Sequence, residues 1–164
     1  MTMEFINHNV TQIPASVWIG ALLPLMQDGY QLKICPAGRS MIPFLRGGRD
    51  EAVLSVPGSG YTFKKNDVVL YQIESGLYVL HRICRITSKG YYTLGDGNTG
   101  IEGPFQREDF IAVVEYIIRK GRVILKGDYR YLLLVRLWRL IRPLRPFVIR
   151  QHAVLRRIWI RKRL

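Results

Sequence analysis

The sequence is poor in the residues that build metal sites and disulfide frameworks. It has only two cysteines, Cys35 and Cys84, and three histidines among 164 residues. Two thiols allow at most one disulfide, and in a chain with no apparent secretory segment we expect both to be reduced. Because the histidines are scattered and the cysteines lie far apart, they do not form a ligand set. We therefore expect no metal and no other cofactor.

Long apolar runs are also absent. No stretch reaches the ~18 uninterrupted apolar residues of a membrane-spanning helix, and the most apolar part, residues 131–135, is interrupted by Arg136. Residues 1–12 lack a basic flank followed by an apolar core, so they do not resemble a signal peptide. The sequence predicts a protein without a spanning anchor.

Acidic residues are nearly missing from one end of the chain. The net charge is +13, but residues 119–164 hold 15 Lys and Arg against one acid, Asp128, which gives this end +14 and leaves residues 1–118 at −1. The basic character therefore belongs to a C-terminal tail. A hydrophobic content of 48% with 23% charged residues argues against a disordered chain and favours one sizeable core.

The spacing of apolar residues predicts a mainly β (α+β) fold. Apolar positions three and four apart predict an amphipathic helix over residues 14–28. Short runs rich in β-branched and aromatic residues predict strands at 31–35, 51–56, 67–73, 78–87, 91–94, 110–119 and 122–125. Glycine-containing turns between several of these runs favour antiparallel pairing, and the four glycines of 95–104 predict a loop. We divide the chain into an N-terminal helical segment (1–29), a β domain (30–127) and a basic helical tail (128–164).

Two side chains suggest nucleophilic chemistry. Ser40 lies between Gly38 and Pro43, and His81 follows 41 positions later. A serine hydroxyl needs a base to remove its proton as it attacks, and an imidazole suits that role. Taken alone, Ser40 is more often a helix-capping turn residue, and a single His81 is more often a hydrogen-bonded strand residue. Arg82 alternates with His81, so it is expected on the opposite face of the strand.

Four segments resemble, in order, the boxes of the S24/S26 serine peptidases, the family of signal peptidases and LexA-type repressors. They are residues 38–43 (Gly-Arg-Ser-Met-Ile-Pro), 66–71 (Asn-Asp-Val-Val-Leu-Tyr), 79–83 (Val-Leu-His-Arg-Ile) and 94–98 (Leu-Gly-Asp-Gly-Asn). The resemblance spans about residues 31–115. It implies an antiparallel β catalytic domain of the signal-peptidase type.

The resemblance also implies roles for individual residues. Ser40 matches the family's nucleophile, and His81 matches the general base of the branch that uses histidine in place of lysine. Asp96 or Glu102 would orient the imidazole. The backbone N–H groups of Gly38 and Ser40 would stabilise the oxyanion, and we expect Met41 and Pro43 to contact the substrate. Gly38 departs from the serine found at its position in many bacterial signal peptidases, so any contribution there must come from the backbone.

The tail alternates leucine, isoleucine and tryptophan with arginine, which predicts two basic amphipathic helices separated by Pro143 and Pro146. Three alternatives are open for residues 129–164. An anionic membrane surface suits the mixture of tryptophan, leucine and arginine best. Packing on the β domain or on a protein partner comes next, and nucleic acid is the least favoured. The sequence does not determine the oligomeric state.

Together these features predict a serine endopeptidase with a Ser-His dyad that cleaves a peptide, leader or precursor substrate. The basic tail and the absence of an anchor predict a cytoplasmic location, at the inner face of the membrane. Two alternatives remain: a catalytically silent peptide-binding module, and a self-cleaving LexA-like regulator whose basic tail binds nucleic acid.

Overall fold

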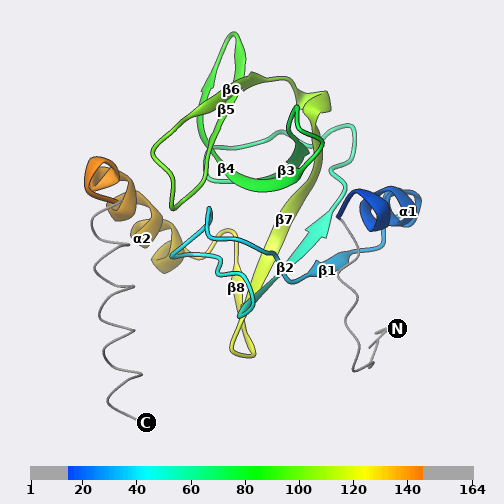
Figure 1. Ribbon diagram of the computed structural model, residues 1–164, viewed down its shortest axis with the longest axis horizontal. Helices are drawn as coiled ribbons and strands as arrows, with labels where there is room; N and C mark the ends of the chain where they lie inside the picture. The colour runs from blue at the N-terminus through cyan, green and yellow to red at the C-terminus, as the bar shows by residue number, and fades with distance from the viewer. Residues whose placement is uncertain (1–14, 146–164) are drawn as a thin grey trace.

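A computed structural model describes residues 15–145, which form one curled antiparallel sheet with a helix at each side (Figure 1). The helices are α1 (Ala15–Gln27) and α2 (Tyr129–Leu140), with short 3-10 turns at Arg107–Asp109 and Arg142–Leu144. The strands are β1 (Leu32–Ile34), β2 (Asp50–Ser55), β3 (Val68–Gln72), β4 (Tyr78–Thr87), β5 (Gly90–Leu94), β6 (Glu102–Phe105), β7 (Phe110–Arg119) and β8 (Arg122–Leu125).

The strand order is β1-β2-β7-β3-β4-β5-β6, and β8 pairs with β7. Every pairing is antiparallel, as expected for strands joined by short turns. The long strand β7 pairs with β2, β3 and β8, so it connects the two ends of the sheet. The β4–β5 and β7–β8 hairpins extend in opposite directions from this centre, and the β5–β6 loop runs toward α2 (Figure 1).

The structure confirms the mainly β fold class, the N-terminal helix and the seven predicted strands to within one or two residues. The prediction of a continuous loop over 95–104 was wrong at its end, where β6 begins at Glu102. Gly103 and Pro104 suggested a loop because both residues are rare inside strands. Strand β6 has a single neighbour, β5, and a proline without an N–H is tolerated on such an edge strand.

Alternate residues of the central strands feed two separate hydrophobic clusters. On β3, Val68 and Leu70 pack in the larger cluster, which also contains residues of both helices, including Ile19 and Val135. Val69 and Tyr71 face the other way, into a second cluster that is rich in aromatic side chains. This alternation follows from the two-residue period of a strand, and it determines which side chains can meet near His81.

Helix α2, the first half of the predicted tail, packs on the β domain. Tyr131 and Val135 are buried, and Asp128 caps the helix by accepting hydrogen bonds from the backbone N–H groups of Arg130 and Tyr131. Of the three alternatives for the tail, packing on the β domain therefore holds for the inner face of α2. The predicted second helix lies outside the described residues. Within residues 15–145, no helix has both the length and the apolar character needed to cross a membrane.

Candidate active site

Ser40 lies in a tight turn that connects β1 to β2. The backbone N–H of Ile42 donates to the carbonyl of Arg39, and the N–H of Phe44 donates to the carbonyl of Met41. Gly38 has a φ of +83°, a left-handed conformation that favours glycine. The side chain of Ser40 is partly exposed. The turn thus presents the hydroxyl at the surface of the domain.

The loop after β5 holds this turn from the other side. The N–H of Gly97 donates to the carbonyl of Ser40 across 2.6 Å. The backbone approaches so closely that a Cβ on Gly95 would lie 2.7 Å from the Ser40 carbonyl oxygen, and one on Gly97 would lie 2.9 Å from that of Arg39. Two of the predicted boxes, 38–43 and 94–98, therefore lie against each other, because glycines leave room for backbone to meet backbone.

His81 lies on β4 with its ring facing the second hydrophobic cluster. Its residue is 4% exposed, and its Nδ1 atom lies 3.0 Å from the Tyr71 hydroxyl and 3.3 Å from Glu102 Oε2. The Tyr71 hydroxyl donates a short hydrogen bond to Glu102 and lies 2.9 Å from Thr93 Oγ1. Strands β3, β4, β5 and β6 each contribute one member of this cluster, which we call the His81 network.

The hydrogen bonds of the His81 network determine the tautomer of the imidazole. Because the Tyr71 O–H donates to Glu102, its oxygen is left to accept from its other neighbours. Burial and the hydrogen bond to Glu102 raise the pKa of Tyr71, so the phenol stays protonated. Nδ1 must then carry the proton that it donates to Tyr71 and Glu102. This leaves the lone pair on Nε2, the arrangement that a general base requires.

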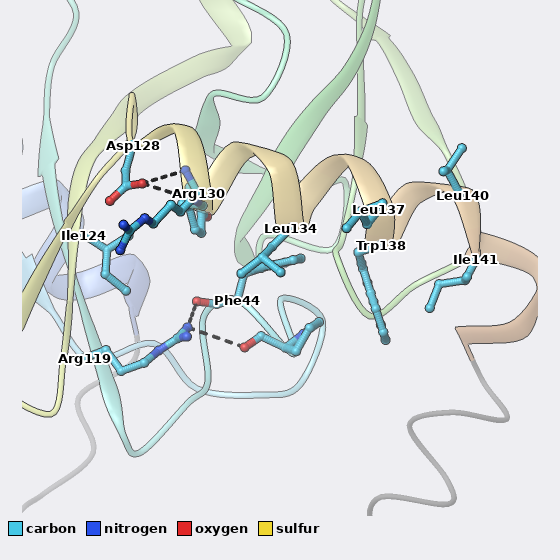
Figure 2. A pocket seen from close by; sticks show the side chains of 12 residues that line it. Phe44, Arg119, Ile124, Asp128, Arg130, Leu134, Leu137, Trp138, Leu140 and Ile141 are labelled. Carbon is cyan, nitrogen blue, oxygen red and sulfur yellow. Dashed lines mark hydrogen bonds between the residues drawn. The ribbon is translucent and has the colours of Figure 1, made fainter.

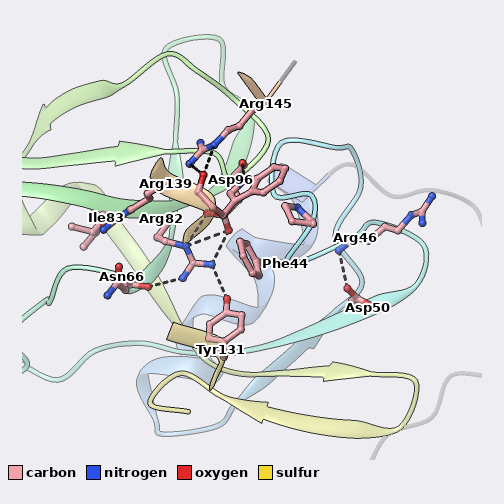
Figure 3. Close-up of polar contacts among 12 residues, drawn as sticks. Phe44, Arg46, Asp50, Asn66, Arg82, Ile83, Asp96, Tyr131, Arg139 and Arg145 are labelled. Atoms are coloured by element: carbon pink, nitrogen blue, oxygen red, sulfur yellow. Dashed lines mark hydrogen bonds and ion pairs between the residues drawn. The ribbon is translucent and has the colours of Figure 1, made fainter. Parts of the chain in front are cut away.

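Arg82, the next residue on β4, points to the opposite face, where it is buried and hydrogen-bonded to several neighbours (Figure 3). Its Nη2 atom lies 2.7 Å from Asp96 Oδ2 and 2.6 Å from the Tyr131 hydroxyl, and its Nη1 donates to the Asn66 carbonyl across 2.8 Å. The guanidinium also lies 5.4 Å from the centre of the Tyr131 ring. Burial lowers the pKa of Arg82, but the charge of Asp96 and the nearby Tyr131 outweigh it and raise the pKa overall.

Asp96 therefore does not orient the imidazole in this structure. Both of its oxygens accept from Arg82, whereas Glu102 contacts His81. The strand registers explain the choice. Leu94 pairs with Arg82, which places that side of β5 and the residues after it on the Arg82 face. Glu102 pairs with Thr93, whose side chain lies on the His81 face.

Helix α2 and the turn after it fasten the 95–99 loop to the domain. Trp138 Nε1 donates to the Asp96 carbonyl across 2.6 Å, and Arg145 Nη1 donates to the Asn98 carbonyl across 2.9 Å. Arg142 donates to the carbonyl of Thr99. Burial lowers the pKa of Arg145. Three side chains of the predicted tail thus support the loop that binds the Ser40 carbonyl.

The other predicted contacts divide between surface and core. Neither Gly38 nor Ser40 donates a backbone hydrogen bond within residues 15–145. Pro43 is exposed. Met41, predicted to touch substrate, instead lies in the larger hydrophobic cluster, with 5% exposure. Its side chain stabilises the turn from below.

The proposed nucleophile and base are not joined by a hydrogen bond in the described part of the chain. His81 bonds through Nδ1 alone, and the Ser40 hydroxyl has no hydrogen-bond partner there. Catalytic hydrogen bonds are often open in proteins without substrate and close when it binds. The structure presents an oriented imidazole and a firmly held serine turn as separate parts.

Tyr71 and Thr93 were missed as members of the site. A signal for Tyr71 was present, since a turn centred near Ser75 pairs Val69 with His81 and leaves Tyr71 diagonal to His81 on the same face. Thr93 carried no such signal, because the β4–β5 register contains an irregularity between Ile83 and Arg85. The spacing of residues in the sequence does not predict a bulge of this kind.

No protein-family model matches the chain, and no curated protein or solved structure matches it significantly. The chemistry of the site therefore rests on its own geometry.

Proposed function

We propose that this protein is a serine endopeptidase of the signal-peptidase-like S24/S26 type, in which Ser40 attacks a peptide carbonyl and His81 is the general base. The observation that carries the proposal is the His81 network. A buried imidazole whose Nδ1 proton is held by Tyr71 and Glu102 offers Nε2 as a proton acceptor. A carboxylate at the second ring nitrogen is the arrangement that orients the general base in serine hydrolases.

The proposed catalytic steps assign a role to each of these residues. Nε2 of His81 would take the Ser40 proton as Oγ attacks, and the imidazolium would later give that proton to the leaving amine. Glu102 lies beside Nδ1, where its negative charge stabilises the imidazolium. The N–H groups of Gly38 and Ser40 would donate hydrogen bonds that stabilise the negative charge developing on the substrate carbonyl oxygen.

The arrangement of the Ser40 turn supports the same assignment. The Gly97 N–H donates to the Ser40 carbonyl, Gly95 allows the close approach, and Arg119 donates to the Phe44 carbonyl just beyond the turn. Rigid support of a nucleophile increases the fraction of encounters in reactive geometry.

Cleavage by the full-length protein is the direct test. We would incubate it with a peptide library that includes leader and precursor sequences, and identify new termini by mass spectrometry. Ser40→Ala and His81→Ala should each lower the turnover number by about 10⁴-fold or more. Ser75→Ala, which removes an exposed hydroxyl in the β3–β4 turn, is the matched control and should cleave normally. Undiminished cleavage by both site variants would refute the dyad.

One observation favours a second candidate, a peptide-binding module without activity. Ser40 and His81 share no hydrogen bond in the described residues, and His81 is almost fully buried. The same library distinguishes the two candidates. A silent module would retain peptides on the immobilised wild-type protein and produce no new termini, whereas an endopeptidase would produce them only while Ser40 and His81 are intact.

A further inference from the structure

Exposed leucines are concentrated on the outer side of α2 and the turn that follows it. Leu133, Leu134, Leu137, Leu140 and Leu144 are between 52% and 77% exposed, and we call them the leucine surface. Val123 and Leu125 of β8 and Tyr129 at the start of α2 are also exposed. Monomeric soluble proteins rarely display a contiguous apolar area of this kind without an interaction partner.

A groove extends from the leucine surface toward the Ser40 turn (Figure 2). It has a volume of about 720 Å³ and lies between α2, Ile124 of β8 and the segment containing Pro43 and Phe44. Leu134 and Trp138 point from α2 toward that segment (Figure 2). The leucine surface and the candidate active site therefore share a border at Pro43, three residues from Ser40.

Packing within the domain does not account for these leucines. The inner face of α2 is already occupied, with Tyr131 and Val135 in the core and Trp138 bonded to the 95–99 loop. A surface helix needs only one apolar stripe to bind its domain. Helix α2 carries a second stripe that faces solvent.

The charges around this surface are almost all positive. Between residues 119 and 145 the only acid is Asp128, and its carboxylate caps α2. Arg139, Arg142 and Arg145 turn inward to backbone carbonyls. The exposed cations of residues 119–145 are Arg130 and Arg136 on α2, and Lys120 and Arg122 at the β7–β8 turn.

These charges discriminate among occupants. A second copy of the chain would bring positive surfaces together, which opposes association. A nucleic acid would satisfy the cations but leave the leucines without an apolar partner. An anionic bilayer satisfies both, because leucines enter the boundary of the acyl chains while arginine and lysine meet the headgroups.

We propose that the leucine surface docks this protein peripherally on anionic phospholipid membranes. Helix α2 has 12 residues, which suits a helix lying in the plane of the interface. Docking in this orientation would hold the Ser40 turn close to the bilayer, because the inner face of α2 supports the loop that binds Ser40. The inference does not depend on peptidase activity.

Vesicle flotation with the full chain tests the proposal. Vesicles of phosphatidylcholine alone would be compared with vesicles that also contain phosphatidylserine. Wild-type protein should float with the anionic vesicles, and less of it at high salt. The double variant Leu137→Asp/Leu140→Asp should bind at least about tenfold less. Leu77→Asp, which alters another leucine of similar exposure in the β3–β4 turn, is the matched control and should bind like wild type.

Several results would overturn the proposal. Equal flotation of the wild type and the double variant would assign binding to another part of the chain. Failure of the wild type to float, or binding confined to an oligonucleotide, would exclude a lipid surface. Loss of self-association in the double variant, with no vesicle binding by the wild type, would identify the surface as a contact between copies. Circular dichroism would establish that the variants are folded, and Arg136→Gln, on the exposed face, gives a second variant that should weaken anionic binding alone.

Discussion

His81 and Arg82 are neighbours on β4, and both are buried, yet their side chains have opposite surroundings. On the Arg82 face, the guanidinium forms an ion pair with the Asp96 carboxylate. It also donates hydrogen bonds to the Tyr131 hydroxyl and to the Asn66 carbonyl. On the His81 face, Nδ1 is the one ring nitrogen that has a hydrogen-bond partner among residues 15–145.

The two faces of β4 are suited to different roles: the Arg82 face to structural support, and the His81 face to the proposed chemistry. A buried charge pair in which every guanidinium nitrogen is hydrogen-bonded cannot exchange partners cheaply, so Arg82 and Asp96 are suited to holding loops in place. An imidazole bound through Nδ1 alone retains a lone pair for a substrate or a nucleophile. One strand thus presents a buried ion pair on one side and the proposed general base on the other.

The largest effect is expected on the Arg82 face. Asp96→Ala would leave a buried guanidinium without its counter-charge and should lower the free energy of unfolding by about 3–5 kcal/mol. Urea unfolding measures this loss. The double variant Arg82→Met/Asp96→Leu should regain much of the stability, because no unpaired charge remains. A loss below about 1 kcal/mol for Asp96→Ala would show that the pair is not the structural anchor.

The His81 face should give the reverse pattern. If the protein is the peptidase that we propose, Glu102→Gln should lower the turnover number at least about tenfold, since the imidazolium loses a negative neighbour. Its free energy of unfolding should change by no more than about 1 kcal/mol, because Glu102 is partly exposed. Glu108→Gln, on the exposed 3-10 turn, is the control. A large stability loss with unchanged turnover would reverse the distinction between the two faces.

The hydrogen bond from α2 to the 95–99 loop should contribute less to stability than the Arg82–Asp96 pair. Trp138→Phe removes the N–H that donates to the Asp96 carbonyl but keeps an aromatic ring against Phe44. We expect the free energy of unfolding to fall by about 1 kcal/mol. Thermal unfolding would be compared with that of Tyr129→Phe, which removes the hydroxyl of an exposed ring at the start of α2. Identical losses in the two variants would contradict the assigned hydrogen bond.

The smallest effect concerns pH. The pKa of Tyr71 is raised by burial and by the hydrogen bond to Glu102. As the pH rises through the ordinary tyrosine value of about 10, the unfolded chain loses a proton that the folded chain retains. The stability that Tyr71 contributes therefore falls above that pH and is constant below it.

Comparison with Tyr71→Phe isolates this contribution. The difference in unfolding free energy between wild type and Tyr71→Phe should shrink from about pH 8 to about pH 11. Tyr30→Phe, which removes an exposed hydroxyl, is the matched control. A difference that stays constant over this range would mean that the Tyr71 hydroxyl is not held as the His81 network requires.

Local pattern was sufficient to predict most of the secondary structure. The alternation along β4 placed His81 and Arg82 on opposite faces, and the 78–87 run predicted the strand to the residue. Strand β6 was not predictable, because its Gly103-Pro104 pair opposes a strand and only the edge position permits it. Which side of α2 packs on the β domain was not predictable either. The helix has two apolar stripes, and the sequence alone does not distinguish the one that is buried.

The sequence by itself determined the fold class, the basic end of the chain and the resemblance of four ordered boxes to a serine peptidase family. These depend on composition, on periods of two and 3.6 residues, and on the order of short segments. Only the tertiary structure decided that Glu102, and not Asp96, lies beside His81, and that Arg82 is sealed by α2. Those pairings depend on strand register, and register is set by contacts between residues far apart in the chain.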